Sequence, residues 1–366
     1  MTADSCCYRA MKPFLPSLLL LGIVASAFAG SATWNLDPSS NDWNTAANWT
    51  PATVPDGPTD VATFQSSNGT AITLSASVEV AALAFDSGAP SYFVSLPRGG
   101  ILTISDIGIV NNSGQLQSFM TGVDARGNFS QIQFTNSASA GNNTSFDNTG
   151  GVAAGAETDF FDNSTADHAM IRNRDGSVFG TFTRFFGSSG AGQSTIINMV
   201  SQIGLGGSGH TEFSENATAD RARMTNEGGI GSFFFPGTVL FQDTSSAGES
   251  EIVSYGADAL FASGGSATFD DSSSAGSATL IASGGNQAGG TIAFLSNSTA
   301  STATLIANGV AQVGGVITFQ QFSSGGQARV KLNGTGSLDL SAYPNSLTIE
   351  YPLEVNWSKP RRSPFV

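Results

Sequence analysis

The sequence predicts an all-β protein, a right-handed parallel β-helix with an N-terminal cap. Three observations lead to this fold class. A segment anchored by phenylalanine recurs eight times with a period of 25–28 residues. Glycine pairs recur between these segments. Charged residues make up only 11% of the 366 residues, against roughly 25% in an average soluble domain, which excludes a helical protein built of Glu, Lys and Arg.

The repeat is clearest when positions are counted from its phenylalanine. The anchors are Phe134, Phe160, Phe185, Phe213, Phe241, Phe269, Phe294 and Phe319. Six residues later stand Ala140, Ala166, Ala191, Ala219, Ala247, Ala275, Ala300 and Gly325. Nine residues later the side chain is small, from Asn143 and Ala169 to Ala328. Eleven residues later stand Ser145, Ile171, Ile196, Met224, Ile252, Leu280, Leu305 and Val330. Alternate positions therefore face inward, as in a strand with one buried side.

A second strand is expected to end at each anchor, because Ile132, Val239, Ile292 and Ile317 lie two residues before it. Short strands in a period of about 26 residues fit one coil of a parallel β-helix, in which equivalent residues stack about 4.8 Å apart. Propeller blades need about 40 residues or more. Glycine pairs such as Gly289-Gly290 mark corners that need a positive φ or a close backbone approach.

This alignment also predicts two ion pairs between neighbouring coils. Arg221 is expected beside Glu249, and Arg223 beside Glu251. Both pairs would lie on the surface, where an ion pair contributes about 0–1 kcal/mol.

The chain divides into four segments. Residues 1–29 resemble a secretory signal peptide, with Arg9 and Lys12 before an apolar run and Ala27-Phe28-Ala29 as the cleavage site. Residues 30–99, which contain three tryptophans, are predicted to form the cap and first strands. Residues 100–335 form the repeats, and 336–366 a last coil and loose tail.

The charge and the cysteine content argue against nucleic-acid partners and against disulfides. There are 28 acidic and 14 basic residues, a net charge of −14, which disfavours nucleic acid because phosphate binding needs clustered cations. Cys6 and Cys7 both lie in the signal segment, so the mature chain has no disulfide. No segment of the mature chain is predicted to span a membrane.

Several motifs resemble those of autotransporter-like secreted β-helix proteins of environmental bacteria, described by the autotransporter-associated β-strand repeat. These motifs are the tryptophan-rich start at 34–64, Ile107–Phe119, and the repeated segments that begin at Ile132 and Ala267. The resemblance covers about 34–341 and implies an exported β-helix. The chain would be a short or truncated member of this group.

The sharpest candidate for a ligand site is an acidic row two residues after the anchor: Asp162, Glu215, Asp243 and Asp271, with Asp270 beside the last. Stacked carboxylates repel unless a cation lies between them, and Ca²⁺ prefers such oxygen ligands. The alternative, which we favour, is that these side chains cap turns on the solvent face. The sequence points to no other cofactor and to no catalytic residue.

Other chemistry has weaker support. Arg172, Arg174 and Arg184 are expected near Asp162 and Asp167, where they would form solvated pairs or supply the base of a lyase. His168 and His210 fall on different faces and form no metal pair. The motif Gly204–Gly209 precedes a predicted strand instead of a helix, so it is no nucleotide loop. Outward aromatic residues are expected only at Phe161 and Phe186, with Leu295 at the same position.

Together these patterns predict a secreted or cell-surface structural or adhesion-type protein without catalytic activity, with polysaccharide or cell-surface glycans as partners. One alternative is a carbohydrate-active β-helix that cleaves acidic polysaccharide, with or without Ca²⁺. Another is a nonfunctional fragment of a longer autotransporter. Export by the signal peptide would place the protein in the periplasm, in the medium or on the cell surface.

Overall fold

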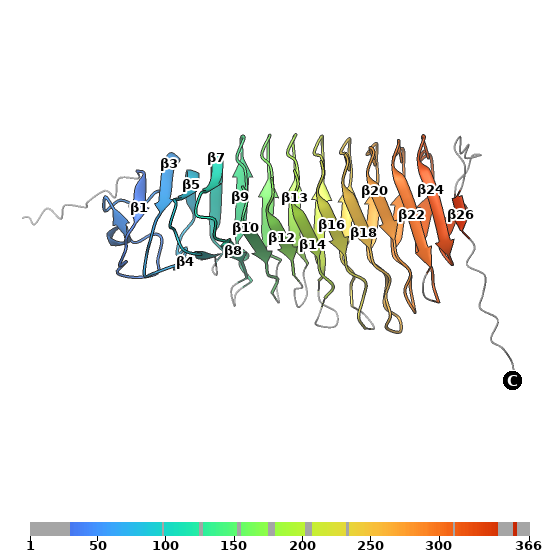
Figure 1. Ribbon diagram of the computed structural model, residues 1–366, viewed down its shortest axis with the longest axis horizontal. Helices are drawn as coiled ribbons and strands as arrows, with labels where there is room; N and C mark the ends of the chain where they lie inside the picture. The colour runs from blue at the N-terminus through green and yellow to red at the C-terminus, as the bar shows by residue number, and fades with distance from the viewer. Residues whose placement is uncertain are drawn as a thin grey trace, which may run out of the picture.

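The computed structural model describes residues 30–96, 99–123, 127–151, 155–174, 180–201, 207–231, 234–309, 312–342 and 354–356. The signal segment 1–29 and the predicted tail lie outside them, apart from 336–342 and 354–356. The described strands form a parallel β-solenoid of about ten turns (Figure 1). The predicted fold class is therefore confirmed, while the right-handed sense and the cap stay predictions.

Two long sheets run the length of the solenoid. The 14-stranded sheet, here sheet A, contains β1 (Ala32–Trp34), β2 (Trp49–Thr50), β3 (Gly57–Phe64), β5 (Val78–Phe85), β7 (Ile101–Asn111), β9 (Gln131–Thr135), β11 (Glu157–Phe160), β13 (Thr181–Phe185), β15 (Gly209–Phe213), β17 (Thr238–Phe241), β19 (Ser266–Phe269), β21 (Thr291–Phe294), β23 (Val316–Phe319) and β25 (Ser337–Asp339). The 12-stranded sheet, sheet B, contains β4 (Ala71–Thr73), β6 (Phe93–Leu96), β8 (Gln117–Thr121), β10 (Thr144–Asn148), β12 (Met170–Asn173), β14 (Thr195–Asn198), β16 (Arg223–Asn226), β18 (Glu251–Ser254), β20 (Thr279–Ala282), β22 (Thr304–Gly309), β24 (Arg329–Gly334) and β26 (Glu354–Asn356). One 3₁₀ turn, Ala46–Asn48, precedes β2.

The two edges of the solenoid differ. From β9 to β23, each strand of sheet A leads through a tight turn of nearly constant length to a strand of sheet B, and these turns line the upper edge in Figure 1. Loops of varied length return to sheet A along the lower edge. We call these the turn edge and the loop edge. Single parallel bridges also connect successive tight turns, from Ser139 and Thr165 to Thr299 and Ser324.

The eight predicted anchors form one continuous stack. Phe134 and Phe160 are parallel neighbours with ring centroids 4.8 Å apart, and the six further steps to Phe319 measure 4.6–4.8 Å. All eight rings are 0–1% exposed. The seven alanines of the row that begins at Ala140 are also fully buried. The predicted repeat register is thus confirmed for the anchor and alanine rows.

The first repeat departs from the predicted register. Ile171 pairs with Phe146, not with Ser145, and Asn143 is exposed in the turn with a φ of 50°. Because this turn holds one more residue than the others, every later side chain of the strand shifts by one position. The assignments of Asn143 and Ser145 to inward rows were therefore wrong.

The sequence reasoning missed a buried polar ladder where sheet B ends. Asn148, Asn173, Asn198 and Asn226 are fully buried, and each of the first three donates from Nδ2 to the next at 2.8 Å. Thr211 Oγ1 also donates to Asn198 Oδ1 at 2.8 Å. Asn173, Asn198 and Asn226 each lie 13 residues after an anchor. This offset continues the alternation of the inward positions at 9 and 11 residues, so the sequence did contain a signal for the ladder.

The glycine corners are explained by close approach of backbones. An ideal Cβ on Gly289 would lie 1.9 Å from the carbonyl oxygen of Gly314, and one on Gly290 would lie 2.0 Å from that of Ser254. Neither glycine has a positive φ. Steric exclusion of a side chain, rather than backbone conformation, requires glycine here.

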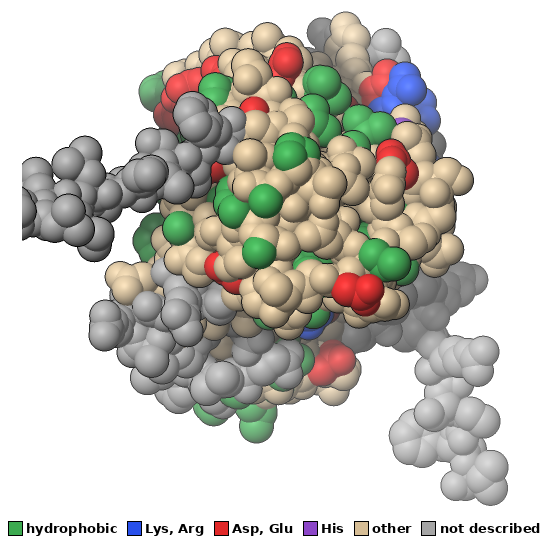
Figure 2. Space-filling view, turned by 90° about the vertical axis from the view of Figure 1, so that its left-hand side faces the viewer, with side chains coloured by type: hydrophobic (Ala, Val, Ile, Leu, Met, Phe, Trp, Pro, Cys, Tyr) green, Lys and Arg blue, Asp and Glu red, His purple; other side chains and the backbone are tan. Residues whose placement is uncertain are grey.

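Three buried tryptophans belong to the core near the N-terminal end of the described chain. Trp49 lies edge-on to Trp34 and Trp43, at 5.0 and 4.9 Å, and Trp49 also contacts Phe64. All are at most 1% exposed. Seen from this end, the surface is mostly uncharged polar groups and backbone, with scattered acidic groups and few basic ones (Figure 2).

Candidate functional site

The acidic row lies in the tight turns, where its carboxylates bind backbone. Asp162, Glu215, Asp243 and Asp271 all have φ between 51° and 58°. Asp162 accepts an N–H from Asn136 of the preceding turn at 2.9 Å, and Asp243 accepts that of Glu215 at 2.9 Å. Glu215 and Asp271 accept the equivalent N–H groups of Gly187 and Asp243 at 2.7 and 3.2 Å. These four side chains thus cap turns.

A left-handed conformation explains the choice of residues in this row, because Asp, Asn and Gly tolerate it best. A second left-handed row follows five residues later, with Gly141, Asp167, Gly192, Asp220, Gly248, Gly276, Ser301 and Gly326. Within the described part of the chain, no group of three or more His, Cys, Asp or Glu side chains is placed to hold a metal ion. The carboxylates of the acidic row are instead engaged by backbone N–H groups of neighbouring turns.

The arginines have other partners than those expected. Arg174 lies 3.0 Å and Arg172 3.7 Å from Oδ1 of Asp147 in β10. Arg184 in β13 binds Asp159 and Glu157 of β11. The expectation that they lie near Asp162 and Asp167 was wrong, because those carboxylates sit in the turns whereas Arg172 and Arg184 lie on strands.

Arg184 belongs to a group of polar and aromatic side chains on the outer face of sheet A. Its Nε and Nη2 donate to the two oxygens of Asp159 at 3.0 and 2.9 Å, and Nη2 also contacts Oε2 of Glu157. Gln131 donates to the same Glu157 oxygen at 2.6 Å. Asp159 and Glu157 side chains are only 2% and 11% exposed. Glu212 of β15 is the register neighbour of Arg184 on its other side.

Burial sets the electrostatics of this group. Desolvation raises the pKa of Glu157, with repulsion from Asp159 adding to it. Burial likewise raises the pKa of Asp159 and of Glu212 despite the nearby guanidinium. Burial lowers the pKa of His210 to about 4, so this imidazole is neutral at pH 7. The group thus combines three carboxyls with one cation.

Aromatic rings flank the charges. Phe182 stacks on His210 with centroids 5.1 Å apart, and Phe161 stacks on Phe186 at 5.2 Å. The Arg184 guanidinium lies 5.8 Å from the Phe182 ring and 5.7 Å from that of Phe186. We call Glu157, Asp159, Phe182, Arg184, Phe186, His210 and Glu212 the aromatic–acidic patch.

Sequence reasoning found only part of this patch. The outward placement of Phe161 and Phe186 was expected, but the Phe182–His210 pair was not. Both residues lie three positions before an anchor, which is an outward position of the strand, so the signal was present. The convergence of Glu157, Asp159, Arg184 and Glu212 was missed because positions were compared with the anchor row alone.

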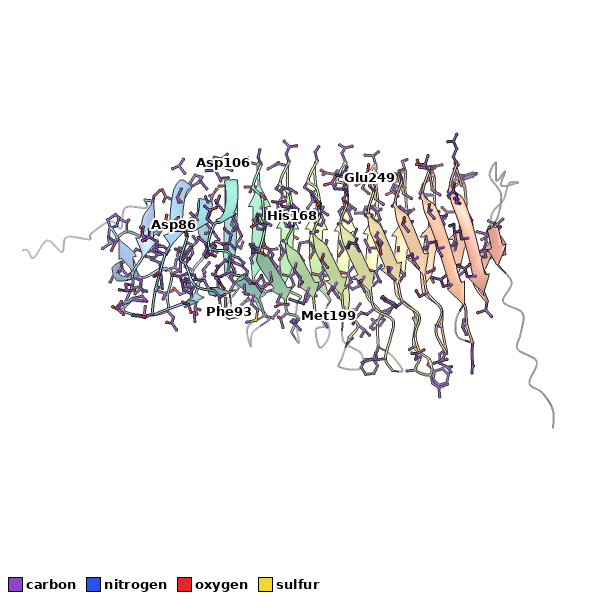
Figure 3. All side chains as sticks on the ribbon, in the orientation of Figure 1. Asp86, Phe93, Asp106, His168, Met199 and Glu249 are labelled. Carbon is purple, nitrogen blue, oxygen red and sulfur yellow. The ribbon has the colours of Figure 1, made fainter. Side chains whose placement is uncertain are left out.

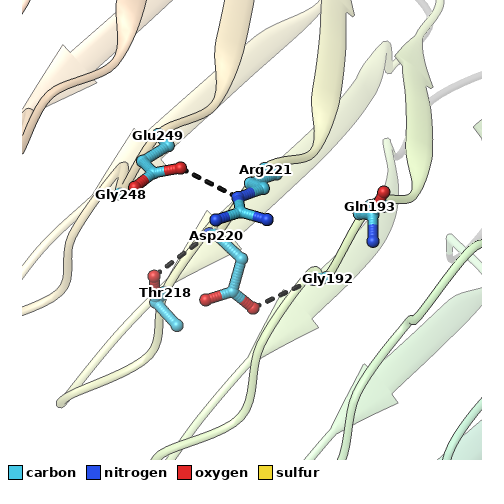
Figure 4. Close-up of a pocket in the computed structure, with 7 residues that line it drawn as sticks. All are labelled: Gly192, Gln193, Thr218, Asp220, Arg221, Gly248 and Glu249. Carbon is cyan, nitrogen blue, oxygen red and sulfur yellow. Dashed lines mark hydrogen bonds and ion pairs between the residues drawn. The ribbon is translucent and has the colours of Figure 1, made fainter.

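A shallow pocket of about 450 Å³ lies separately, at the turn edge (Figure 4). Its lining includes Asp220, which accepts the N–H of Gly192 at 3.0 Å, and Arg221, which donates to Glu249 at 2.8 Å. Arg223 and Glu251 lie 3.5 Å apart. Both predicted ion pairs are therefore confirmed. All four of their side chains are 46–73% exposed, which is typical of a solvated surface.

The remaining candidates lie apart. His168 is in a tight turn, 2.5 Å from Asp167, whereas His210 is in β15. Glu249 and Met199 mark the turn edge and the loop edge in Figure 3. The glycine motif runs into β15, as expected, although Gly204–Gly206 lie outside the described residues. No helix among the described residues is long and apolar enough to cross a membrane.

The chain matches no protein-family model, no curated protein and no solved structure.

Proposed function

We propose that this protein is an exported structural and adhesion-type β-solenoid, which binds polysaccharide at the cell surface or in the medium and does not catalyse a reaction. One observation carries this proposal. The aromatic–acidic patch presents stacked rings and hydrogen-bonding groups on the outer face of a rigid sheet.

The surroundings of the patch support binding along an extended surface. The outward positions of the next strands are mostly small or hydroxylated, as at Thr238, Ser266 and Thr291. The long side of a solenoid offers such shallow, extended surfaces to polymeric ligands. The stacked phenylalanines pack behind this face of the sheet, so little conformational freedom would be lost on binding.

The test is to incubate the purified protein with a panel of plant and bacterial polysaccharides, with and without Ca²⁺, and to measure both binding and the release of new chain ends. We expect binding without release. Absence of binding to every polysaccharide would contradict the adhesion function, and release of chain ends would contradict the lack of catalysis.

A carbohydrate-active enzyme is the second candidate, because three carboxyls meet one arginine at the patch. General acid catalysis needs a carboxyl with a raised pKa, and burial raises those of Glu157, Asp159 and Glu212. Against this role, Asp159 and Glu157 are held by Arg184. If chain ends are released, Glu157→Gln and Glu212→Gln should abolish the release while Glu249→Gln should not.

A further inference from the structure

We propose that the aromatic–acidic patch binds a polymer of amino sugars that carry free amines, with sugar rings packed against the outer edges of Phe182 and His210 and an ammonium group at Glu212. This inference rests on the proposed polysaccharide binding and names its ligand class and contact residues.

The first argument is that the ring pair is available to a ligand. Phe182 and His210 face outward from adjacent strands, and both are only half buried. His210 Nδ1 lies 2.6 Å from Thr238 Oγ1 in the next strand, which fixes the plane of the imidazole. Because the imidazole and the phenyl ring stack on each other, their outer edges form a continuous apolar strip, against which the C–H groups of a sugar ring can pack.

The second argument is that Glu212 has bonding capacity to spare. Asp159, on the other side of Arg184, accepts hydrogen bonds from Arg184 with both of its oxygens, and Glu157 accepts bonds from both Gln131 and Arg184. With the described residues, the Glu212 carboxylate makes no hydrogen bond or ion pair. Glu212 and His210 lie two residues apart on β15 and so point to the same outer face.

The third argument is charge complementarity. The patch holds three carboxyls against one guanidinium, and the whole chain has a net charge of −14. An ammonium group would satisfy Glu212 by a charge-assisted hydrogen bond. A polyuronate would meet like charge instead, so an acidic polysaccharide is the least suitable ligand.

The experiment measures calorimetric binding of three hexamers: glucosamine, N-acetylglucosamine and galacturonic acid. At pH 6 and low salt we expect the glucosamine hexamer to bind about tenfold more tightly than the acetylated one, since acetylation removes the positive charge. Binding of the galacturonic acid hexamer should be undetectable. Added salt should weaken the glucosamine complex more than the acetylated one.

Variants locate the site. Glu212→Gln keeps the size of the side chain and should weaken glucosamine binding about tenfold, with little change for the acetylated hexamer. Phe182→Ala should weaken both. Glu249→Gln, which changes an exposed carboxylate at the turn edge, is the matched control and should change neither. Thermal unfolding of each variant checks the fold, and Phe182→Leu replaces Phe182→Ala if the latter is unfolded.

The outcomes separate this inference from the proposed function. Equal affinity for both glucosamine hexamers, or equal losses in Glu212→Gln and Glu249→Gln, would overturn the inference and leave polysaccharide binding standing. Loss of all binding to the polysaccharide panel would overturn both.

Discussion

The carboxylate of Asp220 occupies the space that a side chain at Gly190 would fill. An ideal Cβ on Gly190 would lie 2.3 Å from Oδ2 of Asp220, and this carboxylate accepts the N–H of Gly192 at 3.0 Å. In other turns a Ser or Thr hydroxyl accepts the equivalent N–H, as Ser139 does from Gly141. Asp220, from the next turn of the solenoid, thus accepts the Gly192 N–H, which Gly190 cannot do because it has no side chain.

Gly190→Ser should therefore stabilise the protein. Ser139 accepts the turn N–H and also donates to Asp167 at 3.0 Å, and a serine at 190 can do the same with Gly192 and Asp220. Gly190 does not have a left-handed φ, so replacing it adds about 0.4–1 kcal/mol by restricting the unfolded chain. Denaturant unfolding measures this gain. Gly190→Val is the control: it displaces the carboxylate without replacing the acceptor and should cost about 1–3 kcal/mol.

Arg184→Met should destabilise the protein strongly at neutral pH. It leaves Asp159 and Glu157 buried without their cation, and removal of one partner from a buried pair costs about 3–5 kcal/mol. The loss should shrink in mild acid, where protonation removes the stranded charges. Arg221→Met breaks an exposed pair, so its cost should stay within about 0–1 kcal/mol. Urea titrations measure the loss of unfolding free energy in both variants. Equal losses would contradict the prediction that the buried pair matters more.

His210 should make the fold sensitive to acid. Burial lowers its pKa in the folded protein to about 4, from 6.5 when unfolded, so the unfolded state binds more protons between these values. The stability due to the neutral imidazole is complete above pH 6.5 and is lost as pH falls toward 4. Glu157, Asp159 and Glu212 act oppositely, because their raised pKa values make the folded state bind protons first.

The contribution of His210 is isolated by comparing the wild type with His210→Gln. The unfolding free energy of the wild type should fall relative to that of His210→Gln as the pH falls from 6.5 to 4. An NMR titration should place the His210 imidazole midpoint near 4. A midpoint near 6.5 would contradict the burial of this ring.

Asn198→Ala should be among the most damaging substitutions in the asparagine ladder. It removes the acceptor for Asn173 Nδ2 and Thr211 Oγ1 and the donor to Asn226. Each buried group left unsatisfied costs about 1–3 kcal/mol, so a loss of at least about 3 kcal/mol is expected. Adding Thr211→Val should recover part of it, since valine already occupies that position at Val239. The exposed Asn163→Ala serves as the control.

Ser245→Ala should raise stability by about 1 kcal/mol, because the buried Ser245 hydroxyl has no hydrogen-bond partner among the residues that the structure describes. Alanine is already present at the same position at Ala138 and Ala217. Ser298→Ala, in the same buried row, should instead lower stability, because Ser298 donates to the carbonyl of Leu295 at 2.6 Å. Thermal unfolding of both variants measures the contrast, and shifts of the same sign would contradict it.

Much of the fold was predictable because a solenoid repeats its core in the sequence. From Phe134 onward, each turn places its phenylalanine ring next to that of the preceding turn. The spacing of the anchors therefore predicted the stack, and it also predicted which residues of the next turn lie beside Arg221 and Arg223. The first tight turn escaped this reasoning. One added residue in an exposed turn costs little, yet it shifts Phe146 into the inward row.

The site was less predictable because its two repeat positions carry different kinds of side chain from turn to turn. Glu157 and His210 lie at −3 from their anchors, whereas Asp159, Arg184 and Glu212 lie at −1. Each position carries its charge in only some turns, so no row appears in the sequence.

By itself, the sequence determined the periodic features of this protein: the parallel solenoid, the buried phenylalanine stack and the surface ion pairs. These features depend on the number of residues between equivalent positions of the repeat, which can be counted in the sequence. Only the tertiary structure decided the features that depend on lateral neighbours. In the structure, Arg184 binds carboxylates of β11, and Phe182 stacks on His210. The carboxylates of the acidic row accept hydrogen bonds from backbone N–H groups of the turns. Parallel pairing places different side chains side by side on one face, and the direction of the Arg184 side chain then determines that Asp159 and Glu157 are the carboxyls it binds.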